Sequence, residues 1–472
     1  MGRISIITAA GGLVGLLLAG CAAPGHHPAR PVGHLGSGSG PGAGPEAHPP
    51  GKQYASAGDV PAGKTGSMQP PAVPKGNLTL ADALAASMLR NPELAAYAFD
   101  MRAAEARLLQ ARVLPNPELE FEVEECDRDG NGFDSAETAV VLTQTFELGG
   151  KRRWRKRAAQ AEGDLAGCDY ESKRLDVFAE TARRFVHVLA AQERLELAAS
   201  AVELAQKTNG AVSERVKAGK EPPLQASKSE AELEMARLDA LAAQNTLAVA
   251  RKKLAAMWGA ETAAFDTAEG SLDHVPNAAA SLEELRSRLE FNPDLARWDT
   301  ELRLRRAALA SQKAARVPDL KASLGFLQYE EDGTDAFAFG VGAPLPLFDW
   351  NHGNIMAARH ELAAAESERS AAAVELAATL AEAQASLTNA HQRVRTLRTK
   401  VVPAMEQAYE AAHEGYRQGK FDFLDMLDAQ RGLFEAQTSL VDALNEYQAA
   451  LIDIQRITAT GIGDLNCEKK EN

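Results

Sequence analysis

The 472-residue sequence carries 51 lysines and arginines against 65 aspartates and glutamates, which leaves a formal net charge of −14. An acidic chain lacks the basic excess that nucleic-acid phosphates require, and four cysteines are too few for a disulfide-rich scaffold. A hydrophobic content of 45% can form a core, but the only long apolar run, residues 4–19, is too short for a membrane-spanning helix.

The N-terminus has the pattern of a signal peptide. Arg3 precedes the apolar stretch, and Leu18-Ala19-Gly20-Cys21 forms a small-residue cleavage site. This pattern resembles a bacterial lipoprotein signal over residues 1–20, in which Cys21 is lipid-modified and becomes the first mature residue. Ala22 after the cysteine then favours the outer membrane. The alternative is an ordinary secretory peptide with an incidental cysteine.

Residues 21–76 are rich in glycine, proline, serine and alanine, and such a segment cannot bury enough apolar surface to fold. We therefore expect a lipidated flexible tether. Its histidines are irregularly spaced, which favours solvated side chains over a metal site; they are His26, His27, His34 and His48.

The remainder of the sequence contains the same landmarks twice. Asn91-Pro92 recurs at Asn292-Pro293, and each pair opens a helical pattern rich in Ala, Arg and Glu. Later landmarks recur in the same order, about two hundred residues apart: 146–150 with 348–353, 216–220 with 416–420, and 258–259 with 460–461. The simplest account is a duplicated unit, with repeats at 77–275 and 276–465 and a polar tail at 466–472.

Each predicted repeat contains a β-hairpin, at 117–148 and at 319–349. Strict alternation at 117–124 sends apolar side chains to one face and glutamates to the other, namely Glu118, Glu120, Glu122 and Glu124. The strands approach the length that crosses a bilayer in a tilted barrel. Open edges are not tolerated in lipid, so several chains should share one barrel, and the glutamates would give it a cation-preferring lumen. A soluble hairpin with a wetted polar face is the alternative.

Long helices follow the hairpins. Residues 151–217 lack proline and are rich in Ala, Glu, Arg, Leu and Gln, which predicts a helix of about 100 Å at about 1.5 Å per residue. Residues 353–418 repeat the pattern, with a kink expected at Pro403. Shorter helices at 224–258 and 421–460 return antiparallel with coiled-coil spacing. A soluble coiled-coil scaffold is the alternative interpretation of these helices.

An acidic stripe opens the last helix. Asp422, Asp425 and Asp428 lie on one face of its first turns, where the helix dipole favours carboxylates. The first repeat has different residues at the matching places, so the stripe is not a by-product of duplication; those residues are Pro222, Gln225 and Lys228. The alternative is a set of helix-capping acids in solvent.

A cluster of six basic residues directly follows the first hairpin and surrounds Trp154; its members are Lys151, Arg152, Arg153, Arg155, Lys156 and Arg157. A net-acidic, exported chain gives little weight to nucleic acid as its ligand. Next to a membrane strand, the cluster can instead reach lipid phosphates at the periplasmic leaflet, with Trp154 as an interfacial anchor.

No other motif indicates chemistry. The loop at 126–132 resembles a calcium loop, but its terminal glutamate is misplaced, which favours a turn. Cys126, Cys168 and Cys467 do not have zinc-site spacing. Hydrolase, nucleotide-binding and zinc-protease signatures are missing from the sequence. We therefore expect no enzyme activity, no cofactor and no resident metal.

Three motifs carry a resemblance to a known family: Asn-Pro-Glu-Leu at 91–94, Leu-Pro-Asn-Pro at 114–117 and Phe-Glu-Leu-Gly-Gly-Lys-Arg-Arg at 146–153. With the lipoprotein signal and the repeated unit, residues 77–465 resemble the TolC-type outer-membrane efflux family, and the last motif is most similar to its heavy-metal, cobalt-zinc-cadmium branch. Multidrug or organic-solvent efflux by the same fold is the alternative.

The resemblance implies a mainly α fold with a membrane β-barrel. In such a homotrimer, four strands per chain form a twelve-stranded barrel, and long antiparallel helices continue it as a tunnel across the periplasm. The implied partners are a periplasmic adaptor (membrane fusion) protein and an inner-membrane pump of the resistance-nodulation-division (RND) type.

The resemblance also implies a gate at the periplasmic aperture. The segment 424–428 is similar to the family segment with paired aspartates, here Asp425 and Asp428, and Tyr416 matches a family aperture position. Phe421 replaces an arginine that locks related apertures. A trimer would gather the carboxylates around one axis, where they would attract cations.

Overall fold

The computed structural model describes residues 74–124, 137–275, 282–289, 292–329 and 333–459. The chain divides into two compact units, Met1–Gly66 and Ser67–Asn472, and every described residue belongs to the second. The signal sequence, Cys21 and nearly all of the tether lie outside the described residues, as do the loop at 126–132 and the tail at 466–472.

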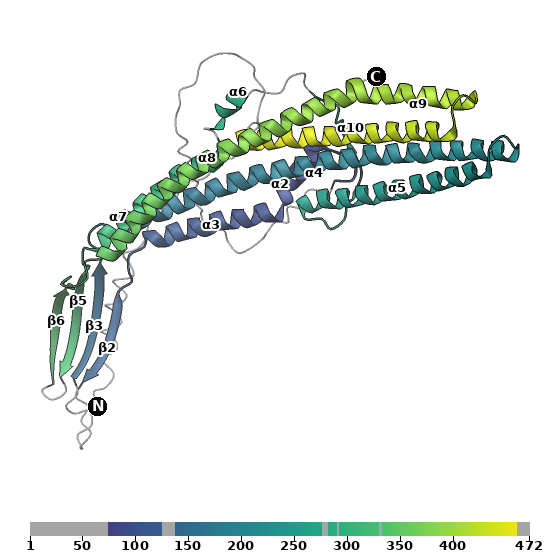
Figure 1. The fold of residues 1–472 in the computed structure, drawn as a ribbon. Helices are drawn as coiled ribbons and strands as arrows, with labels where there is room; N and C mark the ends of the chain where they lie inside the picture. The colour runs from purple at the N-terminus through teal and green to yellow at the C-terminus, as the bar shows by residue number, and fades with distance from the viewer. Residues whose placement is uncertain (1–73, 125–136, 276–281, 290–291, 330–332, 460–472) are drawn as a thin grey trace, which may run out of the picture. The chain divides into compact units, whose positions relative to one another are not determined.

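The described residues form two similar successions of elements (Figure 1). The first comprises α3 (Pro92–Arg112), β2 (Glu118–Glu124), β3 (Glu137–Phe146), α4 (Lys151–Lys217) and α5 (Pro223–Ala255). The second comprises α7 (Pro293–Ala315), β5 (Leu320–Tyr329), β6 (Thr334–Gly342), α8 (His352–Thr396), the π-helix η4 (Leu397–Val401), α9 (Val402–Arg417) and α10 (Phe423–Thr458). Shorter elements flank them, namely β1 (Gly76–Thr79), α2 (Leu80–Arg90), the 3₁₀-helix η2 (Ala256–Trp258), β4 (Phe265–Glu269) and α6 (Leu282–Arg286).

The two hairpins form one antiparallel sheet with the strand order β2-β3-β5-β6. All four strands lie inside the ranges expected from the sequence, and apolar and acidic side chains alternate strictly in β2. A second sheet pairs β1 with β4 in parallel. The sequence analysis did not identify these strands, which have only four and five residues. Among the described helices, none is long and apolar enough to cross a membrane.

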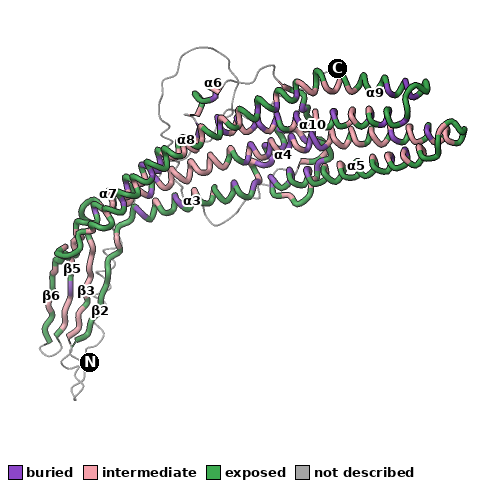
Figure 2. Tube along the Cα trace, viewed as in Figure 1, coloured by how far each residue is buried: buried purple, intermediate pink, exposed green. Residues whose placement is uncertain are grey.

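The helix α4 has the bounds that its composition predicts, and its 67 residues extend about 100 Å at about 1.5 Å per residue. It packs against α3, α5, α7 and α10. Its buried face supplies much of the main core, including Val177, Phe185 and Val188. Figure 2 shows the buried residues concentrated midway along the helices, whereas the sheet is mostly exposed or half-buried.

The two Asn-Pro landmarks are helix caps that also join distant segments. Asn91 accepts a hydrogen bond from the Leu94 amide (2.9 Å), and its side chain donates to the Met257 carbonyl (2.9 Å). Asn292 caps α7 by accepting from the Asp294 amide (2.7 Å), and its side chain donates to the Ile457 carbonyl (2.6 Å). Both asparagines are buried, so each holds the start of one helix against the end of another.

The long helix of the second half is interrupted before Pro403 rather than at it. The π-helix Leu397–Val401 separates α8 from α9, and Pro403 lies in the first turn of α9. Proline has no amide hydrogen and its ring crowds the carbonyl four residues earlier, which is that of Thr399. A wider π turn just upstream accommodates both effects, which explains why the predicted kink is displaced.

Candidate functional site

Both helix pairs reverse direction through the same turn. Gly219 and Gly419 have φ values of 69° and 74°, which favour glycine. The Lys220 amide donates to the Arg215 carbonyl (2.9 Å), and the Lys420 amide donates to the Gly415 carbonyl (2.8 Å). Arg215 and Gly415 therefore occupy matching places in the two turns.

Two of the predicted gate aspartates cap α10. The Asp425 amide donates to the Asp422 carboxylate (2.9 Å), and the Asp422 amide donates to the Asp425 carboxylate (3.2 Å), which is a reciprocal capping box. Asp428 lies one turn further along and is exposed. Within the described part of the chain, its carboxylate forms no ion pair or hydrogen bond. Asp428 is therefore the member of the stripe with no structural task in a single chain.

Tyr416, the predicted aperture tyrosine, is buried inside the chain with 7% of its surface exposed. Its ring lies 6.0 Å from that of Phe423, in a small core with Val212, Met426 and Leu427. This core joins α4, α9 and α10 beside the two turns. Burial raises the pKa of the Tyr416 phenol, and its hydroxyl has no hydrogen-bond partner among the described residues.

Arg215 is a residue of this site that the sequence analysis missed. Its guanidinium lies 5.1 Å from the centre of the Tyr416 ring and forms an ion pair with Glu221 (3.1 Å). At the matching place, a Cβ on Gly415 would overlap the ring of Phe421. The Arg215–Glu221 ion pair of the first turn thus corresponds to the contact between Gly415 and Phe421 in the second. Only the comparison of the two turns, two hundred residues apart, could have identified this.

The strand register gives the sheet two different faces. Glu120 pairs with Val141, which pairs with Gly325, and this face carries all four β2 glutamates together with small and polar residues. Lys321 on the same face forms an ion pair with Glu118 (3.8 Å). The opposite face is mainly apolar. Its exposed apolar residues are Leu119, Phe121, Val140, Leu324, Phe337, Phe339 and Val341, and Phe326 on the same face is half-buried.

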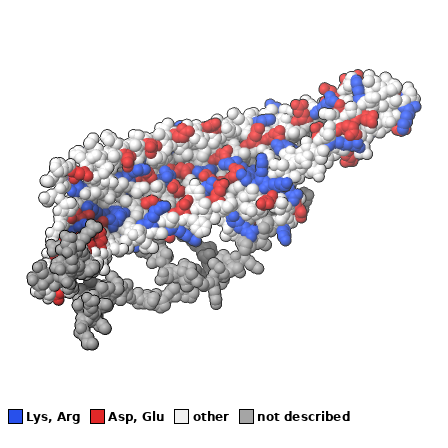
Figure 3. All heavy atoms as spheres, turned by 90° about the horizontal axis from the view of Figure 1, so that it is seen from below, with Lys and Arg blue, Asp and Glu red and all other residues white. Residues whose placement is uncertain are grey.

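The basic cluster at the start of α4 divides into two groups. Lys151 forms an ion pair with Asp319 (2.7 Å), and the Arg152 guanidinium donates to the Arg112 carbonyl at the end of α3 (2.7 Å). Arg153 instead lies over the ring of Trp154 (5.6 Å). Figure 3 shows acidic and basic side chains interspersed along the helices, with basic side chains gathered towards the strand-bearing end.

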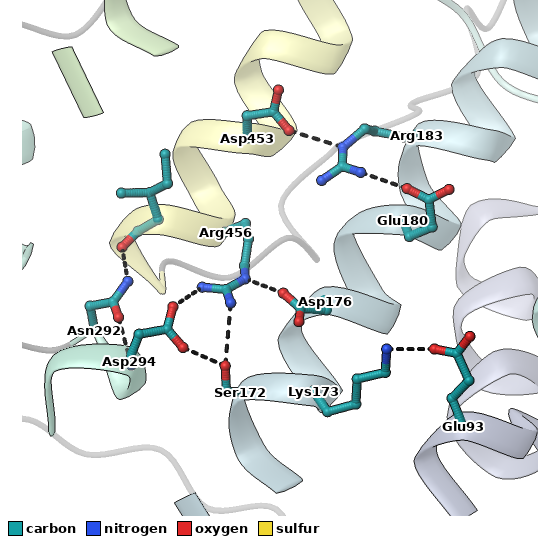
Figure 4. A network of polar contacts seen from close by, with 11 residues as sticks. Glu93, Ser172, Lys173, Asp176, Glu180, Arg183, Asn292, Asp294, Asp453 and Arg456 are labelled. Atoms are coloured by element: carbon teal, nitrogen blue, oxygen red, sulfur yellow. Dashed lines mark hydrogen bonds and ion pairs between the residues drawn. The ribbon is translucent and has the colours of Figure 1, made fainter. Parts of the chain in front are cut away.

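A polar network holds the end of α10 against α4 and α7 (Figure 4). Arg456 forms ion pairs with Asp176 (2.6 Å) and Asp294 (2.7 Å), and Ser172 donates to the Asp294 carboxylate. Burial would raise the pKa of Asp294, but the hydrogen bonds from Arg456 and Ser172 outweigh it and lower the pKa below the ordinary value. The network fixes this helix junction in its charged form.

The described residues contain no group of three or more His, Cys, Asp and Glu side chains that could hold a metal ion. Among the single histidines, His187 is half-buried on α4, where burial and the nearby Arg194 lower its pKa. The charges described above therefore belong to helix junctions, turns and one face of the sheet.

Comparison with known proteins accounts for this arrangement. The chain is 36% identical over 396 residues to the cobalt-zinc-cadmium resistance protein CzcC of Cupriavidus metallidurans, covering 83% of this chain and 93% of that protein. The crystal structure of CusC matches with a TM-score of 0.70 at 17% identity, covering 80% of this chain and 91% of that chain. The outer membrane protein VceC of Vibrio cholerae matches with a TM-score of 0.68 at 19% identity, covering 81% and 96%. Residues 83–260 and 285–460 match the outer membrane efflux protein family, and the chain therefore belongs to this family, as its motifs predicted.

Proposed function

We propose that this outer membrane efflux protein is the channel of a tripartite exporter of heavy-metal cations, working with a periplasmic adaptor and an RND-type inner-membrane pump. The observation that carries the proposal is the 36% identity over 93% of CzcC, a protein named for resistance to cobalt, zinc and cadmium. The solved structures of CusC and VceC are 17% and 19% identical to this chain, so they support the fold alone and do not favour drug or solvent efflux.

In this proposal three chains complete the membrane part. The outer strands β2 and β6 each pair on one side only, and unpaired strand edges are costly in lipid. Joining β6 of one chain to β2 of the next would close a twelve-stranded barrel. The exposed apolar face would then contact lipid, and the glutamate face would line the lumen.

The helices would continue this barrel as a tunnel into the periplasm. Two matching halves, each with a hairpin and a long helix pair, support an origin by duplication with repeats at 77–275 and 276–465. A lipid on Cys21 and the tether at 21–76 would add a membrane anchor. Incorporation of labelled palmitate into the wild type and its loss in Cys21→Ser would test this anchor.

The aperture would lie at the turns between the long helices. Exposed carboxylates of Asp425 and Asp428, repeated in three chains around one axis, would repel each other and attract cations. Beside them, the core around Tyr416 and the Arg215–Glu221 pair would hold α9 and α10 against α4.

A conductance experiment tests this gate. Asp425→Asn combined with Asp428→Asn removes the charges while the amide at 425 can still accept the capping hydrogen bond. We expect a higher single-channel conductance in planar bilayers and weaker block by trivalent cations. The matched control is Glu230→Gln with Asp239→Asn, two exposed acids on α5. Unchanged currents and unchanged block in the Asp425/Asp428 variant would remove the gate assignment.

A complementation experiment tests the substrate class. The gene, expressed with its neighbouring pump and adaptor in a metal-sensitive host, should raise tolerance to zinc, cobalt or cadmium. Tolerance to dyes and organic solvents should stay unchanged. Increased tolerance to dyes and solvents without increased tolerance to metals would favour drug efflux over metal efflux, and the proposal that the protein is a channel would still hold.

A further inference from the structure

We infer that Arg153 and Arg157, held against Trp154, form a binding site for the phosphate group of an anionic phospholipid in the periplasmic leaflet. This inference rests on the proposed membrane-embedded trimer. In this inference, some residues of the basic cluster stabilise the connection between β3 and α4, and the others bind the lipid.

Half of the basic residues at the start of α4 are already used within the chain. Lys151 pairs with Asp319 (2.7 Å), and Arg152 donates to the Arg112 carbonyl (2.7 Å). Arg155 pairs with Glu147 (2.5 Å) and also donates to the Val113 carbonyl (3.2 Å). Arg152 and Arg155 thus satisfy carbonyls at the end of α3, and all three side chains fix the connection between β3 and α4.

The arginines at 153 and 157 have a different environment. Both are exposed, and their guanidinium carbons lie 5.6 Å and 4.7 Å from the centre of the Trp154 ring. No acidic side chain of the described residues forms an ion pair with either. Like charges four residues apart on a helix repel, and cations near a helix N-terminus oppose its dipole. Helix stability therefore does not explain these two arginines, whereas an external anion would.

Their place in the fold identifies the anion. Only the four residues 147–150 separate the end of β3 from Lys151, the first residue of α4. The sheet that contains β3 has an exposed apolar face with Phe337 and Phe339 (71% and 82% exposed). A tryptophan at such a boundary is typical of the lipid headgroup level. The arginines would therefore lie at the depth of the phosphate groups.

The chemistry of the side chains favours a phosphate. A planar guanidinium can donate two parallel hydrogen bonds to phosphate oxygens. It can do so while it remains stacked on an aromatic ring, here that of Trp154. Two positive charges favour a lipid with net negative charge, such as phosphatidylglycerol, over the zwitterionic phosphatidylcholine.

Native mass spectrometry of the full-length trimer in detergent tests the inference, with dioleoyl-phosphatidylglycerol and dioleoyl-phosphatidylcholine as probes. The wild type should bind the anionic lipid more tightly. Arg153→Gln with Arg157→Gln should lose roughly thirtyfold in affinity for it, because each basic residue near a membrane surface contributes about fivefold. Arg153→Lys with Arg157→Lys keeps both charges and should keep most of the preference.

The matched control is Lys207→Gln with Arg237→Gln, which removes two exposed charges remote from the strands and should change nothing. Equal binding of both lipids by the wild type, or an unchanged preference in the intact Arg153/Arg157 glutamine variant, would overturn the inference. Bilayer conductance separates this failure from failure of the channel proposal. A conducting variant without lipid preference supports both proposals, whereas a silent wild type refutes the channel.

Discussion

Substitutions of Tyr416 can separate the effect of packing from that of hydrogen bonding at the proposed aperture. Its hydroxyl is buried without a partner among the described residues, while its ring contacts Phe423 and Arg215. Tyr416→Phe should therefore leave conductance unchanged and raise stability by about 1 kcal/mol, because it removes an unsatisfied buried group. Tyr416→Ala should lower the melting temperature and raise conductance, since it empties the core between α9 and α4. An open channel in Tyr416→Phe would show that the hydroxyl itself holds the aperture.

The raised pKa of Glu193 predicts how the stability of the protein depends on pH. Burial, together with the negative charges of Asp273 and Glu196, raises the pKa of Glu193 to about 7 from an ordinary 4.5. The folded state then holds the proton more tightly than the unfolded chain. The stabilisation is complete below pH 4.5 and is lost as pH rises through about 7.

Glu193→Gln cannot ionise and should be more stable than the wild type at pH 8. The gain should be about 1 kcal/mol after allowance for solvent screening, because the side chain is only partly buried. The two melting temperatures should converge between pH 8 and pH 5 in a thermal denaturation series. Parallel curves across this range would contradict the predicted ionisation.

At the scale of the elements, adjacent glycines between β3 and α4 offer a matched comparison. Gly149 and Gly150 have φ values of 69° and 74°. A Cβ on Gly149 would lie 2.7 Å from the Val317 Cβ and 2.9 Å from the Ala314 carbonyl oxygen, whereas a Cβ on Gly150 meets nothing within 4 Å.

Gly150→Ala should therefore lower the free energy of unfolding by only about 1 kcal/mol, which is the cost of holding an alanine in the left-handed conformation. Gly149→Ala should cost distinctly more, since α7 must also move away. The yield of heat-modifiable trimers on gel electrophoresis measures the difference. Similar yields for the two variants would show that the contact with the end of α7 is not needed for assembly.

The sequence predicts individual elements more completely than the contacts between them. Alternation located β2, the internal repeat located β5, composition predicted the bounds of α4, and the landmarks at Asn91 and Asn292 marked the starts of α3 and α7. These features are local, because each depends on residues within a few turns. The second bond of each asparagine, to Met257 and Ile457, joins segments far apart in the chain. Sequence spacing alone contains no signal for it.

The candidate sites show the same division. The acidic stripe at Asp422 was visible as a helical spacing, but its capping box was considered only as an alternative. The tasks of Lys151 and Arg152 depend on Asp319 and on the end of α3, which only the folded chain brings near. Arg215 is part of no recognisable sequence motif. Its partner Tyr416 belongs to the other half of the sequence, so their contact could not be predicted from spacing.

For the whole molecule, the glutamate face of the sheet predicts the ion selectivity of the assembled channel. Replacing Glu118, Glu120, Glu122 and Glu124 by glutamine removes four negative charges per chain from one face. The ratio of cation to anion permeability should fall by several-fold, because a lumen lined by one sign of charge concentrates its counter-ions. The reversal potential under a potassium chloride gradient measures this ratio. An unchanged potential would place the glutamates outside the conduction path.

The two long helical rods differ in continuity. The first, α4, is an unbroken α-helix of 67 residues, whereas its counterpart is divided into α8 and α9 by the π turn Leu397–Val401. A π turn weakens the regular hydrogen-bond ladder, so the second rod is locally less stiff in bending. A force applied at the far turns would therefore leave the first helix pair straight and flex the second at one level. The aspartates lie on the neighbouring helix α10, which the turn at Gly419 joins to α9, so bending of α9 at the π turn would be transmitted to them through this turn.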